Sequence, residues 1–172
     1  MARAASSRDG GAQCDCYCRM DQVATIRSHA LRVRKAIEAI PPAARPPEMF
    51  SFPSGACGAT SLLLGAILAD NGFTGFLYVC GERPPDDGAR TVSHAWLADG
   101  DLIVDITADQ FADSPEPVIV SVASSWHKSF ALEHTEPADF RTTLSPGTYP
   151  LLTMFAQLQK ALTQVVGANV DA

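Results

Sequence analysis

Three residues of the sequence have types and contexts suited to covalent catalysis: Cys57, His94 and Asp105. Cys57 lies where a turn-rich segment gives way to an apolar run, so we expect it at the start of a helix. His94 and Asp105 lie in two short segments with β-type composition. A thiolate nucleophile, its base and a group that orients the base are what acyl-transfer chemistry requires. The sequence therefore predicts a cysteine-nucleophile enzyme.

His94 and Asp105 are predicted to meet across a β-hairpin. Residues 92–98 and 101–106 flank an Asp-Gly dipeptide, which is favoured in two-residue type I′ turns. Residues equally far from such a turn are paired, and this places His94 directly opposite Asp105. Their Cβ atoms are then expected about 4.5–5.5 Å apart on one face of the sheet, within reach of a carboxylate–imidazole hydrogen bond.

The environment expected around Cys57 favours the thiolate. A helix N-terminus and a neighbouring imidazolium both lower a thiol pKa, from about 8.5 toward roughly 3.5–7.5. The Cys57 amide is expected to be an oxyanion donor, because the first N–H groups of a helix have no partner within it. The candidate oxyanion or substrate residues are Ser54, Gly55, Gly58, Trp96 and Gln110.

Each of the three residues also has a structural interpretation. A lone Cys at a helix start is often a small buried hydrophobe, and an Asp that ends a strand often caps the next turn. The three contexts together with the hairpin register favour catalysis over these alternatives. We expect Cys80 to be a buried strand residue and the other histidines to be surface or packing residues; these are His29, His127 and His134.

Composition limits the other functions. With 172 residues the chain is long enough for one domain with its own core, and its apolar runs are too short to span a bilayer. The net charge of −6 gives no electrostatic reason to expect nucleic acid or a membrane as a partner. The first residues have no apolar stretch of the kind a secretory signal needs, so we expect a cytoplasmic protein. We see no cofactor motif and expect neither a cofactor nor a metal.

Three of the five cysteines, Cys14, Cys16 and Cys18, are clustered near the N-terminus. An odd total fits a reducing compartment better than a full set of disulfides. The cluster could bind a soft metal or act in redox chemistry. Its alternate-residue spacing differs from the two-residue gap of zinc knuckles, and we favour a cysteine-rich leader without such a role.

Hydrophobic periodicity predicts an α+β fold with an antiparallel sheet. Residues 1–19 are expected to form a flexible arm and residues 20–172 a single domain. The expected helices are 21–40, 57–71 and 151–166, with a helical turn at 108–111; the expected strands are 76–80, the hairpin and 118–122, with a loop at 82–90.

Four short runs of the sequence share a known pattern. They are Ser54-Gly55-Ala56-Cys57-Gly58-Ala59-Thr60-Ser61, Gly81-Glu82, His94-Ala95-Trp96-Leu97 and Val104-Asp105-Ile106-Thr107. Over about residues 52–111 this pattern resembles the transglutaminase-like core of the papain-like cysteine hydrolase superfamily. There, a Gly-x-Cys helix start, a His-Ala-Trp strand and a Val-Asp-x-Thr strand carry the catalytic Cys, His and Asp.

The resemblance implies a cysteine helix packed on an antiparallel sheet and acyl transfer through a thioester. The sequence departs from the family at Ile106, where Pro is common, and it has no Gln shortly before Cys57. Our leading hypothesis is a hydrolase that cleaves an amide bond of a peptide or protein, as a peptidase, amidase or deamidase. The alternatives are an acyltransferase with an amine acceptor and a binding module that keeps the fold without the chemistry; the oligomeric state is left open.

Overall fold

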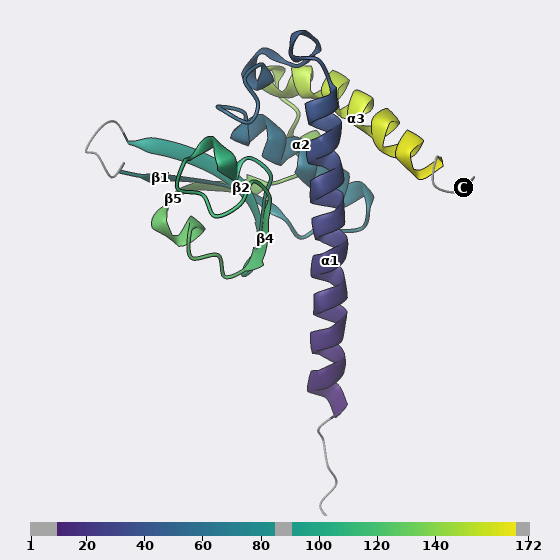
Figure 1. The fold of residues 1–172 in the computed structure, drawn as a ribbon, viewed down its shortest axis with the longest axis vertical. Helices are drawn as coiled ribbons and strands as arrows, with labels where there is room; N and C mark the ends of the chain where they lie inside the picture. The colour runs from purple at the N-terminus through teal and green to yellow at the C-terminus, as the bar shows by residue number, and fades with distance from the viewer. Residues whose placement is uncertain (1–9, 85–90, 168–172) are drawn as a thin grey trace, which may run out of the picture.

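The structure, a computed structural model, describes residues 10–84 and 91–167 (Figure 1). Within these residues the chain forms three α-helices and one five-stranded antiparallel sheet, so the predicted α+β class is confirmed. The strands follow the order β4-β3-β2-β1-β5 across the sheet. The elements are α1 (Gly10–Ala39), α2 (Cys57–Asp70), β1 (Leu77–Arg83), β2 (Val92–Asp99), β3 (Leu102–Asp105), β4 (Ile119–Val122), β5 (Ala131–Pro137) and α3 (Tyr149–Gly167).

Helix α1 is longer than the sequence analysis predicted. It begins at Gly10 and not at Asp21, so residues 10–19 of the expected arm are helical, whereas residues 1–9 lie outside the described residues. Figure 1 shows the amino-terminal part of α1 projecting away from the sheet and the other helices. Its carboxy-terminal half carries the predicted apolar stripe, which is confirmed as fully buried at Ile26, Ala30, Val33 and Ile37.

Helix α2 is the buried centre of the domain, as its apolar sequence predicts. It packs against β2 and β1 on one side and contacts α1 and α3. Gly65, in the middle of α2, lies against the backbone of Ala138: a Cβ at position 65 would stand 2.5 Å from the Ala138 carbonyl oxygen. This glycine therefore permits a close approach between the helix and the segment that follows β5. In the described part of the chain, no helix has both the length and the apolar character needed to cross a membrane.

The hairpin forms between the predicted strands, but its register differs from the prediction. The ladder pairs Leu97 with Val104 and Asp99 with Leu102, which leaves Gly100 and Asp101 as the loop. Gly100 has a φ of 56°, whereas Asp101 does not have a positive φ. Positive φ at the first loop position alone indicates a type II′ turn, since type I′ needs it at both positions. The predicted type I′ turn and the directly opposed pair of His94 and Asp105 were therefore wrong.

The register error leaves the side chains on their predicted faces. Relative to the prediction, β3 is displaced along β2 by two residues, and an even displacement preserves the face to which each side chain points. His94 and Asp105 consequently become diagonal neighbours instead of direct ones. Diagonal neighbours on one face remain within reach when one of the side chains is long or aromatic.

Strand β2 is buried on both faces. Leu97 belongs to the main core between the sheet and the helices, whereas the preceding residue, Trp96, belongs to a second cluster with Val79 and Phe130. Successive strand residues point to opposite faces, so the two clusters lie on opposite sides of β2. His94 shares its face with Trp96, and the aromatic rings of the second cluster surround it.

Strand β5 was absent from the sequence-based prediction. It pairs with β1 at the edge of the sheet, and its side chains are almost all exposed. A strand that buries neither face lacks the apolar alternation from which strands are identified. The closing helix was predicted closely: α3 buries Leu151, Phe155 and Leu158 as expected.

We expect Gly65→Ala to destabilise the protein, although Ala is the better helix former by about 1 kcal/mol. The new methyl group would meet the Ala138 carbonyl, and overpacking of this kind costs roughly 1–3 kcal/mol. Chemical denaturation followed by circular dichroism measures the free energy of unfolding. A variant as stable as the wild type, or more stable, would contradict the close approach of α2 and Ala138.

Candidate active site

Cys57 is the first residue of α2, and the local sequence leaves the end of this helix open. Ala56 occupies the N-cap position and has no side-chain acceptor for the first N–H groups. The first intrahelical bond of α2 runs from the Thr60 N–H to the Ala56 carbonyl at 2.9 Å. The amides of Cys57, Gly58 and Ala59 precede this bond and have no acceptor within the helix. The helix thus presents N–H donors and the positive end of its dipole beside the Cys57 sulfur.

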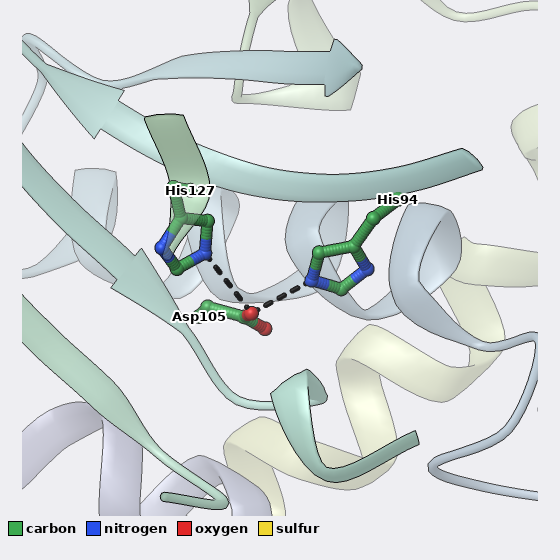
Figure 2. Close-up of side chains that lie close together, drawn as sticks. All are labelled: His94, Asp105 and His127. Carbon is green, nitrogen blue, oxygen red and sulfur yellow. Dashed lines mark hydrogen bonds and ion pairs between the residues drawn. The ribbon is translucent and has the colours of Figure 1, made fainter. Parts of the chain in front are cut away.

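His94 and Asp105 form a buried pair (Figure 2). The Nε2–H of His94 donates to Oδ2 of Asp105 at 2.7 Å, and the two side chains are 0% and 1% exposed. Oδ1 of Asp105 accepts from the backbone N–H of Thr107 at 2.8 Å and from its hydroxyl at 3.1 Å. The carboxylate is therefore held at both oxygens, and it fixes the tautomer and orientation of the His94 ring.

The Cys57 thiol and the His94 ring lie close enough for each to shift the pKa of the other. Burial raises the pKa of the Cys57 thiol, but the neighbouring His94 ring, the Ala95 backbone and Gln110 together lower it further, and the pKa lies below its ordinary value. Burial likewise lowers the pKa of His94, whereas Asp105 and Cys57 raise it to about 9. Both shifts favour a thiolate–imidazolium pair at neutral pH.

Gln110 joins the site from the short helical turn after β3. Its Oε1 accepts from the backbone N–H of Gly55 at 3.3 Å, and its Nε2 donates to the Thr107 carbonyl at 3.0 Å. The same Nε2 lies 3.1 Å from Nδ1 of His94 and close to the Cys57 sulfur. An amide N–H can donate to Nδ1 only while the His94 ring is neutral, so protonation of Nδ1 would free this N–H to face the Cys57 sulfur.

The remaining candidate residues differ in how close they lie to Cys57 and His94. Trp96 packs against the His94 ring at a centroid distance of 5.8 Å. Gly58 lies against the hydroxyl of Tyr78, which is 3.3 Å from the position that a Cβ would take. Ser54 is exposed and makes no side-chain hydrogen bond to any other residue that the structure describes. The structure thus brings Gln110, Trp96 and Gly58 to the site and leaves Ser54 outside it.

Two residues of the site were missed by the sequence analysis. His127, interpreted as a surface or packing residue, is 3% exposed, and its Nε2 lies 3.2 Å from Oδ2 of Asp105. Tyr78 lies near Cys57, and burial together with the charges of Cys80 and Cys57 raises the pKa of its phenol to about 12. No local motif marks either residue, because both approach the site through pairing of distant strands. Cys80, expected to be buried, is only partly buried.

The donor atoms of His94, Asp105 and His127 lie within 4.8 Å of one another, a grouping that could hold a metal ion. Tetrahedral zinc with bonds of about 2.0–2.1 Å would place its ligand atoms roughly 3.3 Å apart. Oδ2 of Asp105 and Nε2 of His94 are only 2.7 Å apart, so they share a proton instead. The side chains of Cys14, Cys16 and Cys18 lie outside the described residues.

Comparison with known proteins does not assign the chain to a family. No protein-family model, no curated protein and no solved structure matches the chain.

We expect alkylation to distinguish Cys57 from Cys80. The pKa of Cys57 is lowered, whereas burial and the charge of Cys57 raise the pKa of Cys80. Iodoacetamide at pH 7 should therefore label Cys57 at least tenfold faster than Cys80, and this advantage should grow as the pH falls from 9 to 6. Peptide mass spectrometry of timed samples measures both rates. Equal rates at pH 7 would show that Cys57 is an ordinary thiol.

Removal of metal should leave the site intact. Prolonged dialysis against EDTA is expected to change neither the melting temperature nor the rate of Cys57 alkylation, because a proton occupies the place between Asp105 and His94. A stoichiometric metal in the purified protein, with a lower melting temperature after its removal, would show instead that these residues are ligands.

Proposed function

We propose that the protein is a cysteine hydrolase that cleaves an amide bond of a peptide or protein substrate through a thioester on Cys57. The observation that carries the proposal is that Cys57, at the start of α2, lies beside the buried, hydrogen-bonded pair of His94 and Asp105. A depressed thiol pKa next to a raised imidazole pKa is the electrostatic state of an activated cysteine nucleophile.

The arrangement of the elements supports the same proposal. A helix that begins at Cys57 packs on an antiparallel sheet, and adjacent strands of that sheet, β2 and β3, carry His94 and Asp105. This is the arrangement that the resemblance to the transglutaminase-like core implies. We therefore propose that the domain is a papain-like fold of the transglutaminase-like type.

In the first half of the proposed reaction, the Cys57 sulfur attacks the carbonyl carbon of the substrate amide. The π electrons of the carbonyl move onto its oxygen, which the Cys57 amide and Nε2 of Gln110 are placed to receive. The Nδ1 proton of His94 passes to the amine nitrogen as the C–N bond breaks. A thioester on Cys57, a free amine and a neutral His94 remain.

Water completes the cycle. Nδ1 of the neutral His94 accepts a proton from water while the water oxygen forms a bond to the thioester carbonyl. The tetrahedral intermediate then collapses, the bond from carbon to sulfur breaks, and a carboxylic acid leaves. Cys57 and His94 return as thiolate and imidazolium, and Asp105 remains ionised throughout.

Tyr78 is placed to assist at the oxyanion. Its hydroxyl lies against Gly58 at the open end of α2, and its raised pKa keeps the phenol protonated as a hydrogen-bond donor. A neutral donor suits this position, because an ionised phenolate would repel both the thiolate and a developing oxyanion. We assign Tyr78 the role of an additional oxyanion donor in the proposed reaction.

We expect p-nitrophenyl acetate to acylate Cys57 in a burst of one nitrophenolate per protein, followed by slower hydrolysis of the thioester. The sulfur forms a bond to the acetyl carbon and nitrophenolate leaves, so absorbance measures the burst and mass spectrometry locates the acetyl group. Cys57→Ala should abolish the burst, and the control Cys80→Ala should retain it. An acetyl group on Cys80, or a burst in Cys57→Ala, would exclude Cys57 as the nucleophile.

The same protein can then be offered a glutamine peptide with and without a primary amine. Release of ammonia without incorporation of the amine supports hydrolysis, and incorporation shows that an amine replaces water as the acceptor. A biological effect that survives Cys57→Ala would show that the domain acts by binding alone.

A further inference from the structure

Two histidines converge on one carboxylate oxygen (Figure 2). Nε2 of His94 and Nε2 of His127 lie 2.7 Å and 3.2 Å from the same Oδ2 of Asp105. They come from different elements: His94 belongs to β2, whereas His127 opens the short 3₁₀ helix after β4. The reaction proposed above requires only one of them, so the second needs a separate physical explanation.

The hydrogen bonds of His127 define its tautomer. Nδ1 of His127 lies 2.8 Å from the hydroxyl of Ser124, and Oδ2 of Asp105 is a pure acceptor when the carboxylate is ionised. A neutral imidazole has one N–H, so the proton must lie on Nε2 and the Ser124 hydroxyl must donate to Nδ1. Burial and the charge of His94 together lower the pKa of His127 more than Asp105 raises it, which keeps the ring neutral at neutral pH.

Packing fixes the ring of His127 in this orientation. Trp96 and Trp126 each lie edge-on to it with centroids 4.9 Å away, and the His94 ring is stacked at 6.2 Å. Protonation of His127 would place two cations on stacked rings, and the charge of His94 opposes it. The titratable groups in contact with the His127 ring are Asp105 and His94. Asp101 and Lys128 line a small cavity together with His127.

The need for this second donor follows from the burial of Asp105. A carboxylate that is 1% exposed has lost its water, and desolvation alone would raise its pKa. Its hydrogen bonds, from His127 and His94 above all, hold the pKa well below the usual range. In the proposed cycle, however, His94 loses its positive charge when it gives its proton to the leaving amine. His127 does not change its protonation and can support the carboxylate at every step.

We propose that His127 is a positioning residue: as a permanently neutral Nε2–H donor to Oδ2, it keeps buried Asp105 ionised and oriented while His94 alternates between its charged and neutral forms. The proposal rests on the cysteine chemistry proposed above for its catalytic meaning. The hydrogen-bonding role itself can be tested whether or not that chemistry is correct.

The direct test is nuclear magnetic resonance of the full chain. In the wild type at pH 7, ¹⁵N shifts should show His127 neutral with its proton on Nε2. In His127→Phe, which keeps a ring but has no donor, the ¹³C titration of the Asp105 carboxyl should move to higher pH; in His127→Gln, which restores an N–H, it should return toward the wild type. His29→Phe, on α1 and away from the site, is the matched control and should leave the titration unchanged.

The kinetic readout is the rate of Cys57 alkylation by iodoacetamide as a function of pH. Loss of the donor should move the acid limb of this profile to higher pH. It should also slow alkylation at pH 7 by roughly 10–100-fold, the effect typical of losing a residue that hydrogen-bonds to a metal ligand and orients it. Should His127→Phe fail to fold, Ser124→Ala serves in its place, because it frees the tautomer of His127 and should produce a smaller shift of the same sign.

A proton on Nδ1 of His127, a charged ring at pH 7, or an Asp105 titration that stays in place or moves to lower pH in a folded variant would each overturn the proposal. These outcomes are separate from a failure of the proposed function. If p-nitrophenyl acetate never acylates Cys57, the hydrolase proposal falls while the titration of Asp105 still decides the role of His127.

Discussion

The ionised carboxylate of Asp105, with almost no access to water, is the constraint around which the rest of the site is built. Desolvation favours the protonated form of such a group, and only hydrogen-bond donors and positive charge can reverse that preference. The fold supplies four donor contacts, two at each oxygen, from His94, His127 and Thr107. A carboxylate has about four lone-pair positions, so this set satisfies it completely.

The order of the elements along the chain brings these donors to Asp105. Strand β3 ends at Asp105, and the turn that follows returns the Thr107 amide to Oδ1. The 3₁₀ turn at residues 108–110 then brings the Gln110 amide toward Cys57. Strand β4 pairs with β3 as far as Asp105, and the chain after β4 delivers His127 to the other side of the carboxylate. The Asp105 carboxylate therefore connects β2, through His94, with the segments that follow β3 and β4.

The sequence was most informative where chemistry is local. The turn-rich approach to Cys57 and the apolar run after it identified a helix start, and the even period of β-strands kept His94 and Asp105 on one face despite a misjudged turn. The turn was misjudged because the two-residue loop could be either Asp99-Gly100 or Gly100-Asp101, and the structure has the second. His127 and Tyr78 could not be predicted, since each depends on strand pairing between distant segments. The extension of α1 to Gly10 shows that residues 10–19, which carry no apolar stripe, can still continue a helix.

Strand β2 joins the two halves of the molecule, because Leu97 packs among the helices while Trp96 packs around the site. Because both clusters pack on β2, disorder in either cluster would remove packing contacts from the strand that the other depends on. Local opening that exposes His94 but spares the helices is therefore costly, and the backbone amides of β2 should exchange with solvent chiefly through global unfolding. The geometry around His94 should consequently persist until the whole domain unfolds, so that heating would disrupt the site and the core in a single transition.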